Sequence, residues 1–274
     1  MIEIDGSYGE GGGQVLRTAL TLSVLTQLKV RIYSIRAGRK NPGLAPQHLT
    51  NVLALAQICD ADVRGAKIGS TEVVFQPQSA PRAGHYIFDV SKAAQRGSAG
   101  SVTLILQTLL LPLAYAEGEN HLILKGGTNV SWSPPFEFLA QVYLPLVERM
   151  GIKAVCTLQS RGFYPIGGGK IEAKIQGVSQ TDTESSPRLA PLNFHQRGDL
   201  RMVKGQALAC NLPAHIPQRM ADRARKLLTN AGLRNEITPR VERSVATGAF
   251  LFLLAEYKHA IAGFSALGER GKSS

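Results

Sequence analysis

The amino-acid sequence predicts an α/β (α+β) fold, built from two repeated β-α-β-α-β-β units with a smaller α/β unit after them. Segments in which every second residue is apolar, as in strands, alternate with segments of helical spacing. The same order of segments occurs twice, with Gly13 equivalent to Gly100 and Gly38 to Gly127, roughly 90 residues apart. A polar stretch at 179–187 is typical of a domain boundary.

These observations divide the chain into two domains. Residues 1–178 form a large domain with units at about 1–80 and 81–178, and residues 179–274 form a small α/β domain. In the first unit, a glycine-rich turn joins a short alternating strand to an apolar helix. The elements expected there are strands at 2–5, 29–35, 61–64 and 71–76, and helices at 15–24 and 49–56.

The second unit repeats this order. Its expected strands are 85–90, 121–125, 152–158 and 170–175, and its helices are 102–115 and a segment that Pro134-Pro135 opens and that runs to Met150. In the small domain we expect a strand at 203–210, a helix at 217–231 with Gly232 as its C-cap, and a strand pair at 250–255 and 260–265.

Composition limits the class of protein. The 274 residues are 44% hydrophobic and carry a net charge of +11, which is spread over both domains and favours polyanionic partners such as nucleic acid or nucleotides. A basic protein without such a partner is the alternative. The three cysteines are far apart, so we expect buried free thiols and no disulfide framework or zinc site. Neither a signal peptide nor a membrane span is recognisable, so we expect a cytoplasmic protein.

The glycine-rich turn at 9–14 is the first candidate site. Glycines between a strand and a helix let backbone N–H groups approach an anion, and the helix N-terminus favours negative charge. The glycine spacing matches neither a Walker loop nor the dinucleotide fingerprint, so a merely tight turn is the alternative. Glu10 would repel phosphate unless a divalent cation lies between them, and a solvated surface glutamate is the competing interpretation.

Several cations follow on adjoining elements. Arg17 interrupts an apolar helical face, and Arg39 and Lys40 follow the next strand, so Arg17 and Arg39 could meet on the same phosphates. A solvated charge run is the alternative, more so for Lys40 than for Arg39. His48, beside an apolar helical face, is expected to be structural.

Three further segments of the second unit are candidate sites. Gln107 lies within the most apolar helix, where a buried amide needs partners that a ligand or the core could supply. The segment 132–136 could offer a flat apolar face to a nucleobase, or simply form a helix-entry turn. Gly167-Gly168-Gly169-Lys170 is followed by an alternating strand, so we expect a hairpin turn.

Taken together, these segments resemble the RNA 3'-terminal phosphate cyclase family. The resemblance covers residues 2–175 densely, in the family's order. The matching stretches are 5–17 (DGSYGEGGGQVLR), 35–39, 42–44 with 47–49, 97–101 with Gln107-Thr108, 126–128 with Pro134-Pro135, 162–165 with 167–169, and 268–272.

The resemblance implies three repeat units like those of enolpyruvyl transferases, with a small domain inserted before the third. It implies ATP-dependent conversion of an RNA 3'-phosphate to a 2',3'-cyclic phosphate, with Mg²⁺ or Mn²⁺ and with an RNA 3'-phosphate end as substrate. In such enzymes ATP adenylylates a histidine, AMP passes to the RNA 3'-phosphate, and the 2'-hydroxyl displaces it. The implied roles are metal binding for Glu10, contact with ATP or RNA phosphates for Arg17, Arg39, Gln47 and Gln107, and packing on adenine for Pro134.

One departure from the family is large. The family's nucleophilic histidine lies in the third unit, which this chain is expected to lack, and none of the six histidines falls in the matching motif. We therefore expect the 274-residue chain to be inactive alone. The alternatives are a non-catalytic, cyclase-like RNA-binding or ribosome-assembly protein and, from the repeat architecture only, an enolpyruvyl transferase. Oligomeric state is not indicated. The decisive expectation is that Glu10, Arg17 and Arg39 face one triphosphate pocket.

Overall fold

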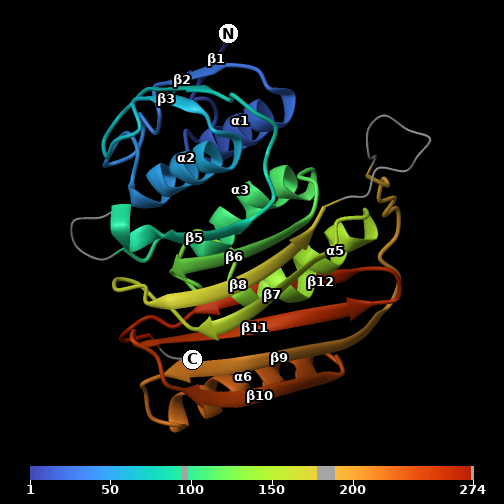
Figure 1. Ribbon diagram of the computed structural model, residues 1–274. Coiled ribbons are helices and arrows are strands. Elements are labelled where there is room, and N and C mark those ends of the chain that lie inside the picture. Colours follow the sequence, from blue (N-terminus) through green and yellow to red (C-terminus); the bar gives the residue numbers. More distant parts are fainter. Residues whose placement is uncertain (94–97, 178–188, 273–274) are drawn as a thin grey trace.

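A computed structural model describes residues 1–93, 98–177 and 189–272, which form three four-stranded sheets with helices between and beside them (Figure 1). The first sheet has the order β1-β2-β4-β3, with β1 (Ile2–Asp5) parallel to β2 (Val30–Tyr33). The other two strands, β4 (Val73–Gln76) and β3 (Asp62–Arg64), pair antiparallel. Two helices, α1 (Gly13–Thr26) and α2 (Pro46–Cys59), connect the strands.

The second sheet has the same topology, β5-β6-β8-β7. Here β5 (His85–Asp89) is parallel to β6 (Glu119–Gly126), and β6, β8 (Gly169–Gln176) and β7 (Ala154–Ser160) pair antiparallel. A 3₁₀ turn, η1 (Val90–Ala93), follows β5, and α3 (Val102–Ala114) leads to β6. The predicted repetition of one β-α-β-α-β-β order is therefore confirmed, and so is the hairpin turn at Gly167.

The second helix of this unit is less regular than predicted. It begins at Phe136, with Pro135 before its first turn, and runs through α4 (Phe136–Phe138), a π-helical segment η2 (Leu139–Tyr143) and α5 (Leu144–Arg149). Among the described residues, η2 is the one π-helical element. The π-helical turn shifts side chains along the helix, and η2 and α4 both contact β12 of the third sheet.

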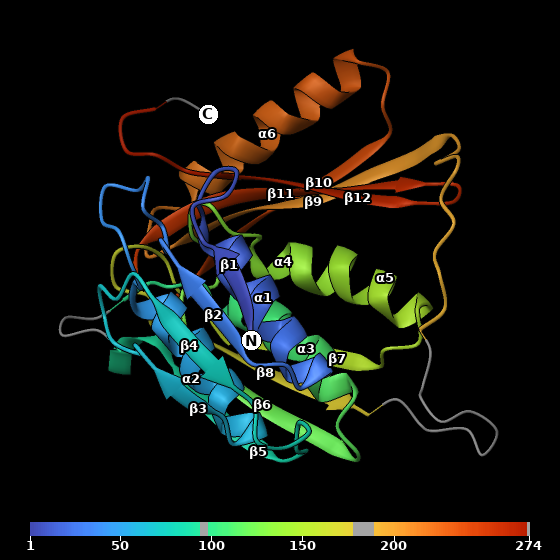
Figure 2. The same ribbon diagram turned by 90° about the horizontal axis from the view of Figure 1, so that it is seen from above.

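The third sheet has the order β10-β9-β11-β12, and α6 (His215–Asn230) covers one of its faces (Figure 2). Its strands are β9 (Leu200–Cys210), β10 (Asn235–Glu242), β11 (Gly248–Tyr257) and β12 (Ile261–Leu267). β10 is an edge strand that the sequence analysis missed. Gly232 has φ of 72° and donates its N–H to Thr229, as expected at a helix C-terminus.

One hydrophobic core joins the first two sheets. Helices α1, α2 and α3 lie between these sheets (Figure 1), and their apolar faces share a cluster with strand residues such as Ile32, Phe75 and Leu124. A second cluster, which includes Phe163, Phe250 and Phe252, lies between the second unit and the third sheet. All three cysteines are free; Cys59 and Cys210 are buried and Cys156 is half-buried.

A buried ion network crosses this second interface. Arg161, 5% exposed, donates to Glu137 on α4 (2.6 Å) and to Glu242 on β10 (2.7 Å), and its guanidinium lies over the Phe250 ring. Glu137 also accepts hydrogen bonds from Gln206 on β9 and from Asn129. The network therefore ties the third sheet to the second unit.

The proposed domain boundary at 178/179 and the polar stretch 179–187 lie outside the described residues. The division into domains stays a prediction. Where the structure describes the chain, none of its helices has the length and apolar character that crossing a membrane requires.

Candidate nucleotide-phosphate site

The candidate site lies where β1 and β2 end. Because these neighbouring strands are parallel, the loops that follow them leave the sheet at the same edge. The Gly6 N–H donates to the Tyr33 carbonyl (2.7 Å), which holds the start of the glycine-rich loop against the end of β2. The loop after β2 carries Arg36, Arg39 and Lys40. The topology thus brings a glycine-rich turn and a cationic loop together.

Arg39 meets the glycine-rich loop directly. Its Nη2 would be 3.2 Å from a Cβ at Gly12, and it lies 3.7 Å from the Glu10 carboxylate. Both charged side chains are exposed, Glu10 to 95%. Such an exposed pair contributes little to stability, so neither side chain is held back from a ligand by the other.

Arg17 is the buried cation of the site. It is 9% exposed in the second turn of α1, its Nη2 donates to Gln14 (2.9 Å), and its Nε is buried without a hydrogen-bond partner. Burial lowers the pKa of Arg17. Among the described residues no carboxylate forms an ion pair with it. A buried guanidinium without a counter-ion is an arrangement that an anionic ligand would stabilise.

Gly13 lets these groups come close. A Cβ at this position would be 3.1 Å from Arg17 Nη1 and would overlap the imidazole of His48 on α2. The pKa of His48 is lowered to about 3, by burial and by the nearby cations Arg36 and Arg17, and its Nδ1 has no partner. His48 is therefore a neutral ring packed against the helix N-terminus, next to the cations.

The remaining predicted residues belong to other surroundings. Gln47 on α2 accepts the Ser101 N–H through Oε1 (2.7 Å), so it joins the first unit to the loop before α3. The Pro134 carbonyl accepts from Thr103 on α3 (2.7 Å). Gln107 is exposed on α3, so the argument from a buried amide was wrong. No hydrogen bond among the described residues joins Gln107 or Pro134 to Glu10, Arg17 or Arg39.

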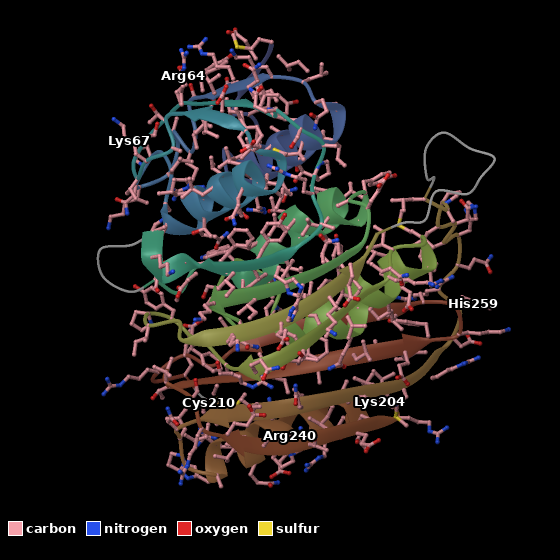
Figure 3. All side chains as sticks on the ribbon, viewed as in Figure 1. Arg64, Lys67, Lys204, Cys210, Arg240 and His259 are labelled. Carbon is pink, nitrogen blue, oxygen red and sulfur yellow. The ribbon has the colours of Figure 1, made fainter. Side chains whose placement is uncertain are left out.

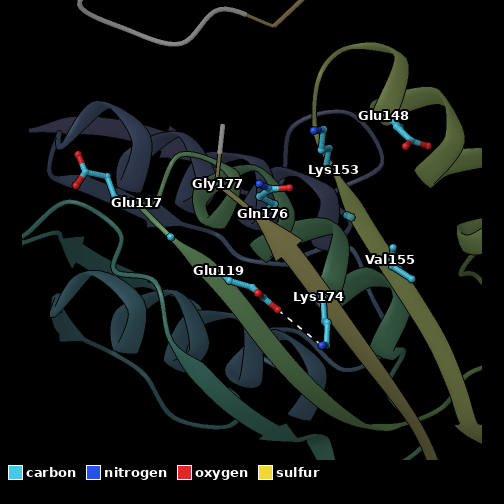
Figure 4. Close-up of a pocket in the computed structure, with 10 residues that line it drawn as sticks. Glu117, Glu119, Glu148, Lys153, Val155, Lys174, Gln176 and Gly177 are labelled. Atoms are coloured by element: carbon cyan, nitrogen blue, oxygen red, sulfur yellow. Dashed lines mark ion pairs between the residues drawn. The ribbon is translucent and has the colours of Figure 1, made fainter. Parts of the chain in front are cut away.

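Glu10, Arg17 and Arg39 thus share one edge of the first sheet, but they line none of the three cavities described here. One of these, of about 840 Å³, lies where β6 and β7 begin and β8 ends, with charged residues of both signs such as Glu119 and Lys174 (Figure 4). The candidate site is therefore separate from these three cavities and surrounds the α1 N-terminus.

The contacts that two residues of the site make were not predicted from the sequence. Gln14 orients Arg17 across one helical turn, and this i, i+3 spacing was a signal that the sequence contained. Arg36 donates to the Gly43 carbonyl (2.7 Å), which fixes the start of the cationic loop. That contact depends on a left-handed backbone at Arg36, with φ of 55°, which no local sequence pattern indicates.

Comparison with known proteins decides the family. A sequence profile described as RNA 3'-terminal phosphate cyclase matches residues 8–255. The chain belongs to the RNA 3'-terminal phosphate cyclase family. Proteins named RNA 3'-terminal phosphate cyclase are 52% identical in Gloeothece citriformis (99% of this chain, 75% of the relative), 50% in Methylococcus capsulatus (100% and 74%) and 43% in Archaeoglobus fulgidus (99% and 76%). The chain therefore spans about three-quarters of these relatives.

Membership in the cyclase family agrees with the mixed α/β fold, and its profile covers the whole candidate site from Gly9 to Lys40. The family resemblance inferred from the sequence is confirmed.

Proposed function

We propose that this protein is an RNA 3'-terminal phosphate cyclase, which uses ATP to convert an RNA 3'-phosphate to a 2',3'-cyclic phosphate. The observation that carries the proposal is the meeting of the Gly12–Gly13 backbone with Arg17 and Arg39 at a helix N-terminus. The names of the relatives favour this over a non-catalytic RNA-binding role. ATP as co-substrate and a cytoplasmic location are parts of the proposal.

The chemistry asks for fixed positive charge more than for acid–base groups. The bond between the α- and β-phosphates of ATP is broken first, pyrophosphate leaves, and the adenylyl group is carried by an enzyme histidine. An oxygen of the RNA 3'-phosphate then takes the adenylyl group, which frees the histidine. The 2'-hydroxyl oxygen then attacks the phosphorus of this 3'-phosphate, the bond to AMP breaks, and AMP leaves as the hydroxyl proton is released. Arg17 and Arg39 would hold the phosphate oxygens and offset their charge. We assign the role of carrying AMP to none of the six histidines.

Other residues would orient the ligands. Gln47 and Gln107 would contact phosphates, and Pro134 would pack on adenine. Pro134 is held by Thr103, which makes it a fixed surface. The side-chain Oε1 of Gln47 accepts the Ser101 N–H, so the side-chain Nε2 of Gln47 is the group left for a ligand.

Glu10 is the residue that would hold Mg²⁺ or Mn²⁺. Magnesium is usually bound by one or two carboxylates together with substrate phosphates and water, and an exposed carboxylate at the phosphate site fits that pattern. When bound, the ion would offset phosphate charge. Within the described ranges, no group of three or more His, Cys, Asp or Glu side chains is arranged to hold a metal, so phosphates would supply most ligands.

The test incubates the full-length gene product, and this chain in parallel, with α-³²P-ATP, Mg²⁺ or Mn²⁺, and RNA bearing a 3'-phosphate. A phosphatase-resistant RNA end is expected from the full-length protein, and its absence would refute the proposal.

A matched pair of variants tests the site itself. Arg39→Ala should weaken ATP binding at least about tenfold, because a guanidinium–phosphate contact is a charge-assisted bidentate interaction. Lys40→Ala removes an equal charge from the same exposed loop and should change the affinity less than about twofold. Equal effects of the two substitutions would reduce Arg39 to a surface charge.

A further inference from the structure

Trp132 has an unusual position that the proposed function does not use. It is the one tryptophan of the chain, its side chain is 100% exposed, and its backbone has φ of 63°. A bulky residue in the left-handed region costs free energy, and an exposed indole ring loses the stabilisation that burial gives. Both features indicate a ring that is presented for contact with another molecule.

The loop around Trp132 is held at several points. The Phe136 N–H donates to the Thr128 carbonyl (3.0 Å), and the Ser133 hydroxyl donates to the Val130 carbonyl (3.0 Å). Asn129 donates to the buried Glu137 (3.0 Å), which belongs to the Arg161 network. The ring therefore stands on a fixed loop, and binding a ligand there needs little ordering of the backbone.

Two cavities lie at the end of β12, one on each face of the third sheet. The first, of about 390 Å³, lies between the 129–135 loop and the end of β12, and Trp132 is in its wall. The second, of about 800 Å³, lies between α6, the beginning of β11 and the end of β12. Their walls share Ala266, Leu267 and Glu269, but Phe250 in the first wall and Leu251 in the second face opposite sides of β11, so the cavities meet around the end of the edge strand β12.

The second cavity has an apolar floor and a cationic rim. Its rim side chains include Arg219, Arg223, Arg270 and Lys272. Glu269 in the shared wall pairs with Lys272 (2.6 Å), which offsets its negative charge. An aromatic surface followed by a groove with cations is the combination that binds single-stranded nucleic acid, because bases stack on the ring and phosphates meet the cations.

We infer that single-stranded RNA lies along a track that runs from Trp132, around the end of β12, to the cavity beside α6. A nucleobase stacks on Trp132, and the backbone phosphates lie beside Arg223 and Arg270. The inference rests on the proposed function, since it places the RNA substrate of that reaction. The same 128–136 loop carries Pro134, so a strand on the track would end near the residue assigned to ATP. The adenine of ATP is the other nucleobase that Trp132 could take.

The first experiment uses Trp132 as its own reporter. The chain is titrated, without ATP, with a single-stranded RNA ending in a 3'-phosphate, while Trp132 fluorescence and the anisotropy of a dye on the RNA 5' end are recorded. Both signals should saturate with one dissociation constant. Trp132→Ala should weaken RNA binding about tenfold, and Trp132→Tyr should restore most of the affinity, since stacking contributes about 1–3 kcal/mol per base.

The second experiment tests the cations. For single strands, each lost phosphate contact lowers the slope of log affinity against log salt by about 0.7, so Arg223→Gln with Arg270→Gln should lower it by about 1.4. Arg240→Gln should leave the slope unchanged, because Arg240 is exposed on β10 and belongs to neither wall (Figure 3).

The outcomes separate this inference from the proposed function. RNA that binds without changing Trp132 fluorescence, and equally well to Trp132→Ala, would overturn the track and leave the cyclase proposal standing. Fluorescence that responds to ATP alone and not to RNA would assign the Trp132 ring to adenine and would also overturn the RNA track. An absence of RNA binding to the unaltered protein would count against the proposed function itself.

Discussion

At the scale of single residues, the candidate site depends on the absence of a side chain at Gly13. His48 and Arg17 occupy the space that a Cβ would need. Gly13→Ala should therefore displace one of them, at a cost of about 1–3 kcal/mol in the free energy of unfolding, as for an overpacked core position. Since these groups belong to the proposed phosphate site, ATP affinity should fall at least about tenfold, which calorimetric titration would measure.

Gly38 provides the matched control for Gly13. A Cβ at Gly38 meets nothing within 4 Å, and its φ lies outside the left-handed region. Gly38→Ala should therefore leave both the stability and the ATP affinity within experimental error. If both alanine variants bound ATP as well as the unaltered protein, the glycine-rich loop would be only a tight turn.

His48 should make the stability of the protein depend on pH. Its pKa is lowered to about 3 in the folded state, by burial and by Arg36 and Arg17, whereas an unfolded histidine titrates near 6.5. Above about pH 6.5 neither the folded nor the unfolded state binds the proton, so His48 does not lower the free energy of unfolding. Between about 6.5 and 3 only the unfolded chain binds it, so acidification favours unfolding by up to about 1.4 kcal/mol per pH unit.

Urea unfolding at a series of pH values would measure this dependence. His48→Gln removes the titrating ring and should flatten the profile below pH 6.5. His259→Gln, which removes an exposed histidine, should leave the profile as it was (Figure 3). Identical slopes for His48→Gln and the unaltered protein would show that His48 is protonated in the folded state.

At the scale of elements, the periodicity of the sequence was enough to predict most of the fold. Strands such as β2 and β8 alternate buried and half-exposed residues, and α3 is apolar on nearly every side because both neighbours cover it. β10 was missed because Asn235–Glu242 contains Pro239 and several polar residues. An edge strand tolerates both, since one side of its backbone needs no partner.

For the candidate site as well, local sequence patterns predicted some features, and the features that depend on tertiary packing were missed. The convergence of Arg17 and Arg39 followed from parallel neighbouring strands, which the sequence pattern indicates. The exposure of Gln107 could not be predicted in this way, because it depends on which side of α3 is covered by α1 and by the second sheet. Arg161 and Glu137 gave no local signal at all, since their partners Glu242 and Gln206 lie far along the chain.

Among the contacts between elements, we expect the Arg161 network to cause the largest loss in the free energy of unfolding when it is broken. Arg161→Met would leave Glu137 buried without its cation, and breaking one partner of a buried pair costs about 3–5 kcal/mol. Arg82→Met breaks an exposed pair with Asp60 and should cost at most about 1 kcal/mol. Denaturant unfolding would measure both, and a loss below 1 kcal/mol for Arg161→Met would mean that the network contributes specificity rather than stability.

At the scale of the whole molecule, the three sheets are joined by shared packing rather than by the connecting chain alone. The cluster around Phe163, Phe250 and Phe252 takes residues from both sides of the second interface, and the Arg161 network lies beside it. The second unit and the third sheet therefore complete each other's cores. This differs from a linked pair of independent domains, whose interfaces are usually small and polar.

The arrangement predicts that residues 1–177 do not keep their stability when expressed alone. Removal of the third sheet would expose Phe163 and Val142, and would take Glu242 and Gln206 away from the Arg161 network. We expect the 274-residue chain to unfold in one cooperative transition, and the fragment to unfold at a lower temperature and to bind a hydrophobic dye.

The control is a chain cut at a protease site introduced between 177 and 189, because it retains the whole interface. Its two pieces should elute together on gel filtration and unfold at the same temperature as the intact chain. If the fragment melted at the temperature of the whole chain without binding the dye, the third sheet would be an independent domain, and an RNA strand that crosses from Trp132 to α6 would have to hold two separately moving parts together.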